Sequence, residues 1–238
     1  MKDQYFGDVN DYRKYGLLRI LCKSTGLPIG VCWMLTESDT SNDGEKRGYL
    51  ESSGKWRHFD PELFDKLRAI EIADGRRSVK AFEGSDLLNE AKYQSSLLVD
   101  SALERRQYFE VCDAQFEQCD LVFFDPDNGV EVKSVPYGAK SSCKYVYWSE
   151  LESVFAKGKS IVVYQHFPRI KRDDFIASLV SETTRRLPGC RIDTYSTAHV
   201  LFLVAAQQEH VSLHCDAPSC VRERWQEQIS HRNHATES

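Results

Sequence analysis

The stretch that decides the fold is Cys119-Asp120-Leu121-Val122-Phe123-Phe124-Asp125-Pro126-Asp127-Asn128-Gly129. Residues 119–124 are predicted to form a strand, and the continuous apolar run at its end is typical of a strand that is covered on both faces within a parallel sheet. Two carboxylates, a proline and a glycine follow that strand directly. Ligands of open α/β sheets bind beyond the carboxyl ends of the strands, so we predict that residues 125–129 form the functional centre.

Apolar runs and helical periodicities on both sides of this stretch predict the remaining elements. Strands are predicted at residues 29–36, 79–82, 160–164, 191–195 and 200–204, the last two forming a hairpin. Helices are predicted at residues 10–23, from 61 onward, and at 102–118, 148–156, 173–186 and 221–229. Asn10 or Asp11 is predicted to cap the first helix. Together these elements predict an α/β fold with a Rossmann-like, mostly parallel sheet and a C-terminal antiparallel hairpin.

Length and composition favour one globular domain. The chain has 238 residues, of which 41% are hydrophobic and 28% are charged, enough to build a large core. We expect a single α/β domain over residues 1–230 and a flexible tail over residues 231–238. No apolar run approaches the roughly 20 residues of a membrane span, and the first residues lack the apolar core of a signal peptide. The protein is therefore expected to be soluble and cytoplasmic, with no membrane partner.

The charge balance excludes a globally basic nucleic-acid-binding protein but allows local basic patches. The formal net charge is -5, whereas such binders carry an excess of basic residues. Basic side chains nevertheless cluster in three places: Arg13, Lys14 and Arg19; Arg105 and Arg106; and Arg169, Lys171 and Arg172. Each cluster is expected either to be a solvated face or to contact a nucleic acid or nucleotide. The sequence indicates no particular oligomeric state.

The loop after residue 124 carries the strongest chemical signal. Asp125 and Asp127 supply carboxylates and Asn128 supplies an amide, while Pro126 restricts the backbone and Gly129 permits a positive φ. Such oxygen atoms can hold a cation or accept hydrogen bonds from an amino group. A simple turn would use the same residue types. Their position after a buried strand favours a site, so Asp125, Pro126, Asp127 and Asn128 are predicted to be catalytic.

Two further loops are expected at the same edge of the sheet. After the strand at 160–164, His166 is predicted to be a general base or phosphate ligand, and Tyr164 and Arg169 to contact substrate. Local packing and a local hydrogen bond of His166 are the alternative for this loop. The loop after the strand at 29–36 lacks a glycine-rich phosphate cradle. Its polar residues are predicted to bind a cofactor or metal, with a solvated loop as the alternative: Thr36, Glu37, Asp39 and Asp43.

A metal-dependent function is an alternative for the same residues. Pro126-Asp127 followed by Glu131 and Lys133 resembles the skeleton of metal-dependent nucleases. In that skeleton Asp127 and Glu131, together with Asp125, would bind Mg²⁺, and Lys133 would steady the attacking water. This alternative predicts a phosphodiesterase in which His166 is a further catalytic group.

The order of motifs resembles the large-subunit ribosomal RNA adenine-N6 methyltransferases, which have the class I methyltransferase fold. Residues 6–18, Phe-Gly-Asp-Val-Asn-Asp-Tyr-Arg-Lys-Tyr-Gly-Leu-Leu, are similar to the N-terminal helix of that family, with Lys14-Tyr15 at its Lys-His pair. Gly48-Tyr49-Leu50 is similar to its Tyr-Asp-Leu segment. Asp125-Pro126-Asp127-Asn128 stands at its catalytic Asp-Pro-Pro-Tyr loop, and residues 164–172 are similar to its Tyr-Pro segment and basic pair.

This resemblance spans residues 6–205 and implies a function. It implies S-adenosylmethionine as the methyl donor, contacted by Glu37 or Asp39, and a substrate adenine whose amino group is oriented by Asp125 and Pro126. It places Lys14 among the substrate-binding residues. We therefore expect nucleic-acid- or nucleotide-directed group transfer of the methyltransferase type. The alternatives are the Mg²⁺-dependent nuclease and a degenerate, non-catalytic binding module.

Overall fold

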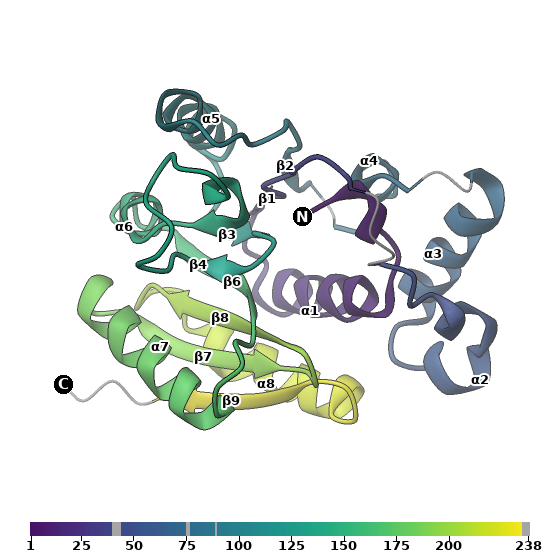
Figure 1. Ribbon diagram of the computed structural model, residues 1–238. Coiled ribbons are helices and arrows are strands. Elements are labelled where there is room, and N and C mark those ends of the chain that lie inside the picture. Colours follow the sequence, from purple (N-terminus) through teal and green to yellow (C-terminus); the bar gives the residue numbers. More distant parts are fainter. Residues whose placement is uncertain (40–43, 75–76, 89, 235–238) are drawn as a thin grey trace.

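The computed structural model describes residues 1–39, 44–74, 77–88 and 90–234. Within these ranges the chain forms a seven-stranded sheet in the order β2-β1-β3-β6-β8-β7-β9 (Figure 1). Its strands are β1 (Ile29–Cys32), β2 (Lys92–Gln94), β3 (Leu121–Phe124), β6 (Ser160–His166), β7 (Arg191–Ser196), β8 (Val200–Ala206) and β9 (Ser230–His234). A separate two-stranded sheet pairs β4 (Gly129–Val130) with β5 (Tyr145–Val146).

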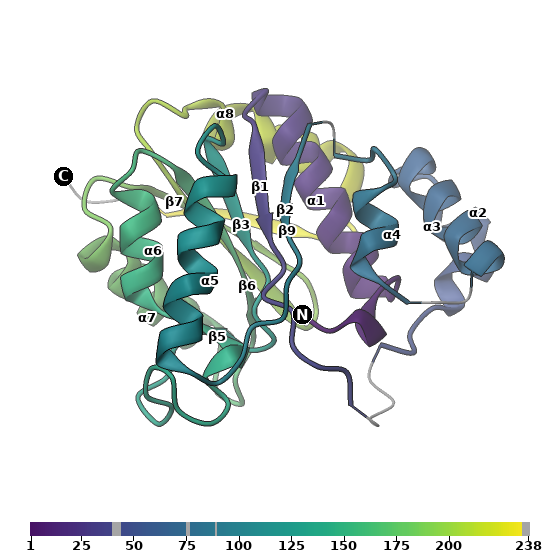
Figure 2. The ribbon, with the colours of Figure 1, turned by 90° about the horizontal axis from the view of Figure 1, so that it is seen from above.

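Helices cover both faces of this sheet. They are α1 (Val9–Thr25), α2 (Ser53–Trp56), α3 (Pro61–Asp74), α4 (Val79–Glu83), α5 (Ala102–Gln115), α6 (Trp148–Phe155), α7 (Arg172–Arg186) and α8 (Ser212–Trp225). Single 3-10 turns occur at η1 (Asp3–Tyr5), η2 (Gly48–Glu51) and η3 (Ser142–Lys144). Figure 2 shows α5, α6 and α7 along one side of the sheet and α1 and α4 on the other. None of the described helices is both long and apolar enough to span a bilayer.

Alternate residues of each strand supply two separate cores. Phe123 and Val162 pack in one core with buried residues of α1 and α8. Their neighbours Val122 and Ile161 pack in the other core with buried residues of α5 and α6. Successive side chains of a strand point to opposite faces, so continuously apolar strands are buried on both sides, as the sequence predicted.

The direction of the strands creates a topological switch point. β2, β1, β3 and β6 run parallel, and β8 is antiparallel to both β6 and β7. The predicted parallel core and C-terminal hairpin are therefore confirmed. From β1 the chain continues to β2, toward one edge of the sheet, and from β3 it continues to β6, toward the other edge. The carboxyl ends of β1 and β3 thus flank the crevice where open α/β sheets bind their ligands.

Two predicted strands differ from those observed. Residues 79–82 form helix α4 instead of a strand. Ser78 caps that helix, and Val79 and Phe82 bury one helical face, with Phe82 stacked on Tyr15 at a centroid distance of 4.0 Å. The strand predicted for residues 29–36 ends at Cys32, because the backbone turns at Met34, which has a φ of 48°. An apolar run alone does not distinguish a strand from the buried turn that follows it.

The two chain ends also depart from the predicted boundaries. The last helix, α8, begins at Ser212 and ends at Trp225, earlier than the predicted residues 221–229. A flexible tail was predicted from residue 231, but residues 230–234 form β9, which pairs with β7. Helix α1 is capped by Asp8, whose side chain accepts the N–H groups of Asn10 and Asp11, so neither predicted residue is the cap.

Candidate active site

A cavity of about 880 Å³ opens at the carboxyl ends of β1 and β3. Small-molecule sites usually have volumes of roughly 300–1,000 Å³. Its walls come from the N-terminal segment, α1, the loop after β3 and the end of β6. The sequence-predicted residues that line it are Lys14, Asp39, Asp125, Pro126, Asp127, Asn128, Tyr164 and His166.

Lys14 joins α1 to the loop after β3. Its Nζ lies 2.7 Å from Asp11 Oδ1 and 2.6 Å from Asp125 Oδ2, and no side chain of the three is more than 5% exposed. The rings that surround the same nitrogen, with centroids at 5.2–5.5 Å, belong to Tyr15, Trp33 and Tyr164. Burial lowers the pKa of Lys14, but Asp11 and Asp125 raise it above its usual value. The charged ammonium therefore bridges two buried carboxylates.

Asp11 is the titratable member of this cluster. Its Oδ2 accepts hydrogen bonds from the Tyr15 hydroxyl at 3.0 Å and from the N–H of Gly7 at 3.1 Å. Burial raises the pKa of Asp11 to about 7; the Lys14 ammonium opposes the rise, and the nearby Asp125 carboxylate adds to it. The folded protein thus holds a proton on Asp11 at pH values where the unfolded chain, with a pKa near 3.8, has lost it.

Removal of this carboxylate should change the pH dependence of stability. Between about pH 4 and pH 7 the native state binds one more proton at Asp11 than the unfolded state, so rising pH favours unfolding. We expect Asp11→Asn to gain stability relative to wild type over that range, with no further change above it. Urea denaturation of both proteins across the range measures the difference. A difference that stays constant with pH would show that Asp11 is already ionised at low pH.

Asp127 is held by the N-terminal segment and by Thr36. Its Oδ1 lies 2.7 Å from the α-amino nitrogen of Met1, and its Oδ2 accepts the Thr36 hydroxyl at 2.9 Å. Burial raises the pKa of Asp127, but the Met1 ammonium and the Thr36 hydroxyl hold it below its usual value. Thr36 therefore orients Asp127 through this hydrogen bond and does not itself line the cavity.

Gln165 fixes the turn that follows the two carboxylates. Its Oε1 accepts the N–H of Val130 at 2.8 Å, and its Nε2 donates to the carbonyl of Asn128 at 3.0 Å. Gly129 has a φ of +123°, and a Cβ at this position would lie 2.2 Å from the Gln165 carboxamide. The predicted positive φ is therefore present. The close approach of Gln165 leaves no room for a side chain, so both features require glycine at this position. The turn is rigid, while the Asn128 side chain lines the cavity.

Several hydrogen-bond acceptors of this loop have no partner within the described residues, and two of them belong to neighbouring residues at the end of β3. One is Asp125 Oδ1, since Lys14 engages only Oδ2. The other is the carbonyl oxygen of Pro126, to which no described donor is bonded. Both residues line the cavity. The loop after β3 therefore offers two adjacent acceptors to a ligand.

His166 lies at the end of β6 on the rim of the cavity. Its side chain is exposed, and its ring centroid lies 5.2 Å from that of Tyr164. The backbone N–H of His166 donates to the carbonyl of Asn128 at 3.1 Å. Desolvation lowers the pKa of His166, although Asp125 and Asp127 raise it. The imidazole is thus mostly neutral near pH 7 and can accept a proton.

Other predicted site residues lie outside the cavity. Glu37 and Arg169 are exposed and do not line it. Asp43 lies outside the described residues. Glu131 Oε1 accepts the N–H of Trp148 at the start of α6, at 2.9 Å, so this side chain caps a helix. The alternative Mg²⁺ set of Asp125, Asp127 and Glu131 is therefore not assembled, and no three His, Cys, Asp or Glu side chains of the described ranges form a metal-binding group.

Lys14 and Arg19 of the first predicted basic cluster and Arg105 of the second are buried, whereas Arg13 is half-buried and Arg106 is exposed. Arg19 pairs with Asp60 at 2.7 Å, and Arg105 pairs with Glu150 at 2.6 Å. Like Lys14, these side chains are held inside the protein, so the prediction of accessible clusters is wrong for them. The third cluster, at residues 169, 171 and 172, is exposed.

Sequence reasoning missed the contribution of the N-terminal segment to the cavity. Lys2, Tyr5 and Asp8 line it, as does Lys144 from η3. The spacing of Asp11 and Lys14 on one face of the predicted helix could have signalled their ion pair. No local pattern marks Lys144 or Lys2, because only the fold brings them to this edge.

Comparison with models of protein families found no match, and no curated protein matches the chain. The function has to be inferred from the cavity itself.

Proposed function

We propose that the protein transfers a group to a nucleotide or nucleic acid in this cavity, and specifically that it methylates an adenine amino group with S-adenosylmethionine. The observed parallel core, followed by an antiparallel hairpin, agrees with the class I methyltransferase-type sheet that the motif order implies. The Asp125-Pro126 pair emerges from β3 at the switch point, where such sheets bind ligands.

The pair of unpartnered acceptors after β3 carries this proposal. An exocyclic amino group has two N–H donors, and Asp125 Oδ1 and the Pro126 carbonyl can each accept one. Lys14 holds the other oxygen of Asp125 at 2.6 Å, and this contact orients the carboxylate before the substrate binds. Preorganised acceptors of this kind position a reacting nitrogen without further ordering of the protein.

Residues around the cavity also fit the polar groups of S-adenosylmethionine, which would supply an electrophilic methyl group. Lys46 and Lys144 line the cavity and suit a carboxylate. Asp8 and Asp39 bring carboxylates that suit an ammonium and ribose hydroxyls, although Asp8 also caps α1 and Asp39 also accepts hydrogen bonds from Lys2 and Gln4. Methyl transfer to nitrogen forms an N–C bond, breaks the S–C bond of the donor and releases a proton. His166, neutral at the rim, can accept that proton.

Substitution of Asp125 tests the proposal. We expect Asp125→Asn and Asp125→Ala to lower methyl transfer to an adenine-containing oligonucleotide by about 100-fold or more, because the amino group loses its positioning acceptor. Methyl-donor binding, measured by calorimetry, should be retained. Asp120→Ala is the matched control, since Asp120 is an exposed aspartate at the opposite end of the same strand.

A substrate analogue separates recognition of the amino group from general binding. An oligonucleotide with purine in place of adenine lacks the amino group, so it should bind but receive no labelled methyl group. Absence of S-adenosylmethionine binding at millimolar concentration would overturn the methyl-transfer proposal. Nucleotide binding without any transfer would favour a non-catalytic binding module instead.

A further inference from the structure

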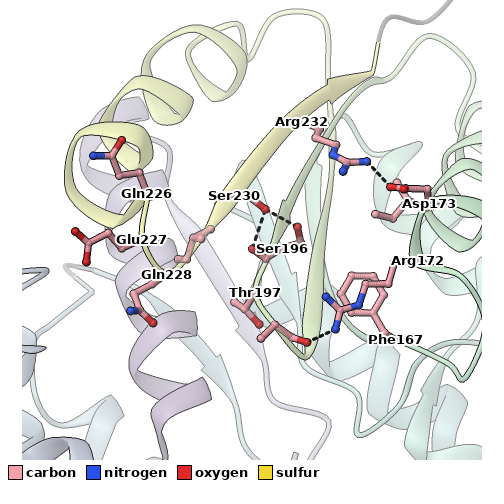
Figure 3. A pocket seen from close by; sticks show the side chains of 13 residues that line it. Phe167, Arg172, Asp173, Ser196, Thr197, Gln226, Glu227, Gln228, Ser230 and Arg232 are labelled. Atoms are coloured by element: carbon pink, nitrogen blue, oxygen red, sulfur yellow. Dashed lines mark hydrogen bonds and ion pairs between the residues drawn. The ribbon is translucent and has the colours of Figure 1, made fainter.

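A second cavity, of about 420 Å³, lies beside the first. It is bounded by the start of α7, the turn between β7 and β8, and the junction of α8 with β9 (Figure 3). Phe167 lines both cavities, and the β7–β8 turn contributes Ala198 to the second cavity and His199 to the first. The two spaces are therefore neighbours that share one aromatic wall.

Arg172 and Phe167 form a flat, cationic face in the second cavity. The guanidinium carbon of Arg172 lies 4.9 Å from the ring centroid of Phe167, and the group donates to the carbonyl of Ala198. This is the one hydrogen bond of the Arg172 guanidinium within the described residues, although a guanidinium has five N–H donors. Several donors thus stay available beside an aromatic ring.

Arg232 supplies a second cation from β9. It pairs with Asp173 at 2.7 Å, but their side chains are 57% and 78% exposed, and an exposed pair of this kind contributes little and exchanges easily. Arg169 and Lys171 are exposed in the loop that enters α7. The acidic Glu227 and the apolar Ile176 and Ile229 also line the cavity. Neutral hydrogen-bonding side chains supply the rest of the walls: Ser196, Thr197, Gln226, Gln228 and Ser230.

We propose that this second cavity binds the nucleotide next to the target in a single-stranded polynucleotide, with the base against Phe167 and Arg172 and the phosphates near Arg172 and Arg232. This inference rests on the proposed function, because the target base would occupy the first cavity. Aromatic rings and arginines that follow a backbone are the usual means by which proteins bind single strands. A free mononucleotide would occupy only the first cavity, so its binding would not depend on the residues of the second.

Binding of short strands and mononucleotides tests the second cavity. Fluorescently labelled single-stranded RNA and DNA 12-mers of about the length that such grooves cover are titrated into the full-length protein, alongside AMP. We expect Arg172→Gln and Arg232→Gln to weaken strand binding several-fold and leave AMP binding unchanged. Each lost phosphate contact should reduce the salt dependence, d(log K)/d(log [salt]), by about 0.7. Phe167→Ala should weaken strand binding by about 5- to 100-fold.

Arg185→Gln is the matched control, because Arg185 is an exposed arginine of the same helix, 62% exposed, that does not line the cavity. Comparison of the RNA and DNA arms identifies which strand is preferred. Equal affinity of wild type for the strand and for AMP, or variants that bind the strand as wild type does, would overturn the second-cavity proposal and leave the first cavity standing. Failure of both the strand and AMP to bind would overturn the proposed function as well.

Discussion

Replacement of Lys14 by methionine is expected to lower the free energy of unfolding by about 3–5 kcal/mol. Methionine keeps most of the apolar stem but removes the ammonium that lies 2.7 Å from Asp11 and 2.6 Å from Asp125. Asp125, and Asp11 where it is ionised, would lose their shared partner, and the cost of an unpaired buried charge is large. Urea or guanidinium denaturation of the two proteins near neutral pH measures the loss.

Lys23→Met provides the control on the same helix. The Lys23 side chain is 62% exposed, so its replacement should change stability by no more than about 0.5 kcal/mol. Addition of Asp11→Asn to Lys14→Met should restore part of the loss, since one uncompensated carboxylate is removed. If Lys14→Met were as stable as wild type, the ion cluster would not form in solution, and Asp125 would lose the contact that orients it.

Replacement of Arg105 by methionine is expected to have an effect of similar size, about 3–5 kcal/mol. Arg105 is fully buried. It holds Glu150 of α6 at 2.6 Å and donates to the carbonyls of Ser142 and Tyr145 at 3.0 and 2.6 Å. Its loss would leave the buried Glu150 carboxylate without a countercharge and remove one hydrogen bond from each of the two carbonyls. Chemical denaturation measures the change in stability.

This substitution should also affect the first cavity. The segment that Arg105 anchors includes Lys144, which lines the cavity and whose carbonyl accepts the N–H of Asn128 at 2.9 Å. Ligand binding in the first cavity should therefore weaken in Arg105→Met. Arg106→Met, at the exposed neighbouring position, should leave both properties unchanged. Unaltered stability of Arg105→Met would mean that α5 does not anchor the segment between β4 and α6.

The fold was predictable where one local pattern was unambiguous. The run of residues 121–124 is buried on both faces as β3, and the helix expected from Pro61 begins there, with the Asp60 side chain accepting the N–H of Leu63 at 3.1 Å. Prediction failed where the same pattern suits two structures. The apolar residues Val79 and Phe82 suit a strand or a helix, and the Ser78 cap together with the stacking of Phe82 on Tyr15 favours the helix.

The candidate site was predictable to the same extent. Its position after β3, and the positive φ of Gly129, follow from local chemistry and strand order. The roles of the individual side chains do not. Glu131 belongs to the same stretch of sequence as Asp127, yet its side chain caps α6, while Lys2 and Lys144 come from distant segments to line the cavity.

By itself the sequence determined the α/β class, the buried strands and the turn chemistry of residues 125–129, because these depend on periodicity and backbone preferences over a few residues. Only the tertiary structure decided which charges meet. Lys14 and Asp125 are 111 residues apart in the chain, yet their side chains pair at 2.6 Å. That pairing arises because both groups are buried at one sheet edge, and a buried charge is stable only beside an opposite one.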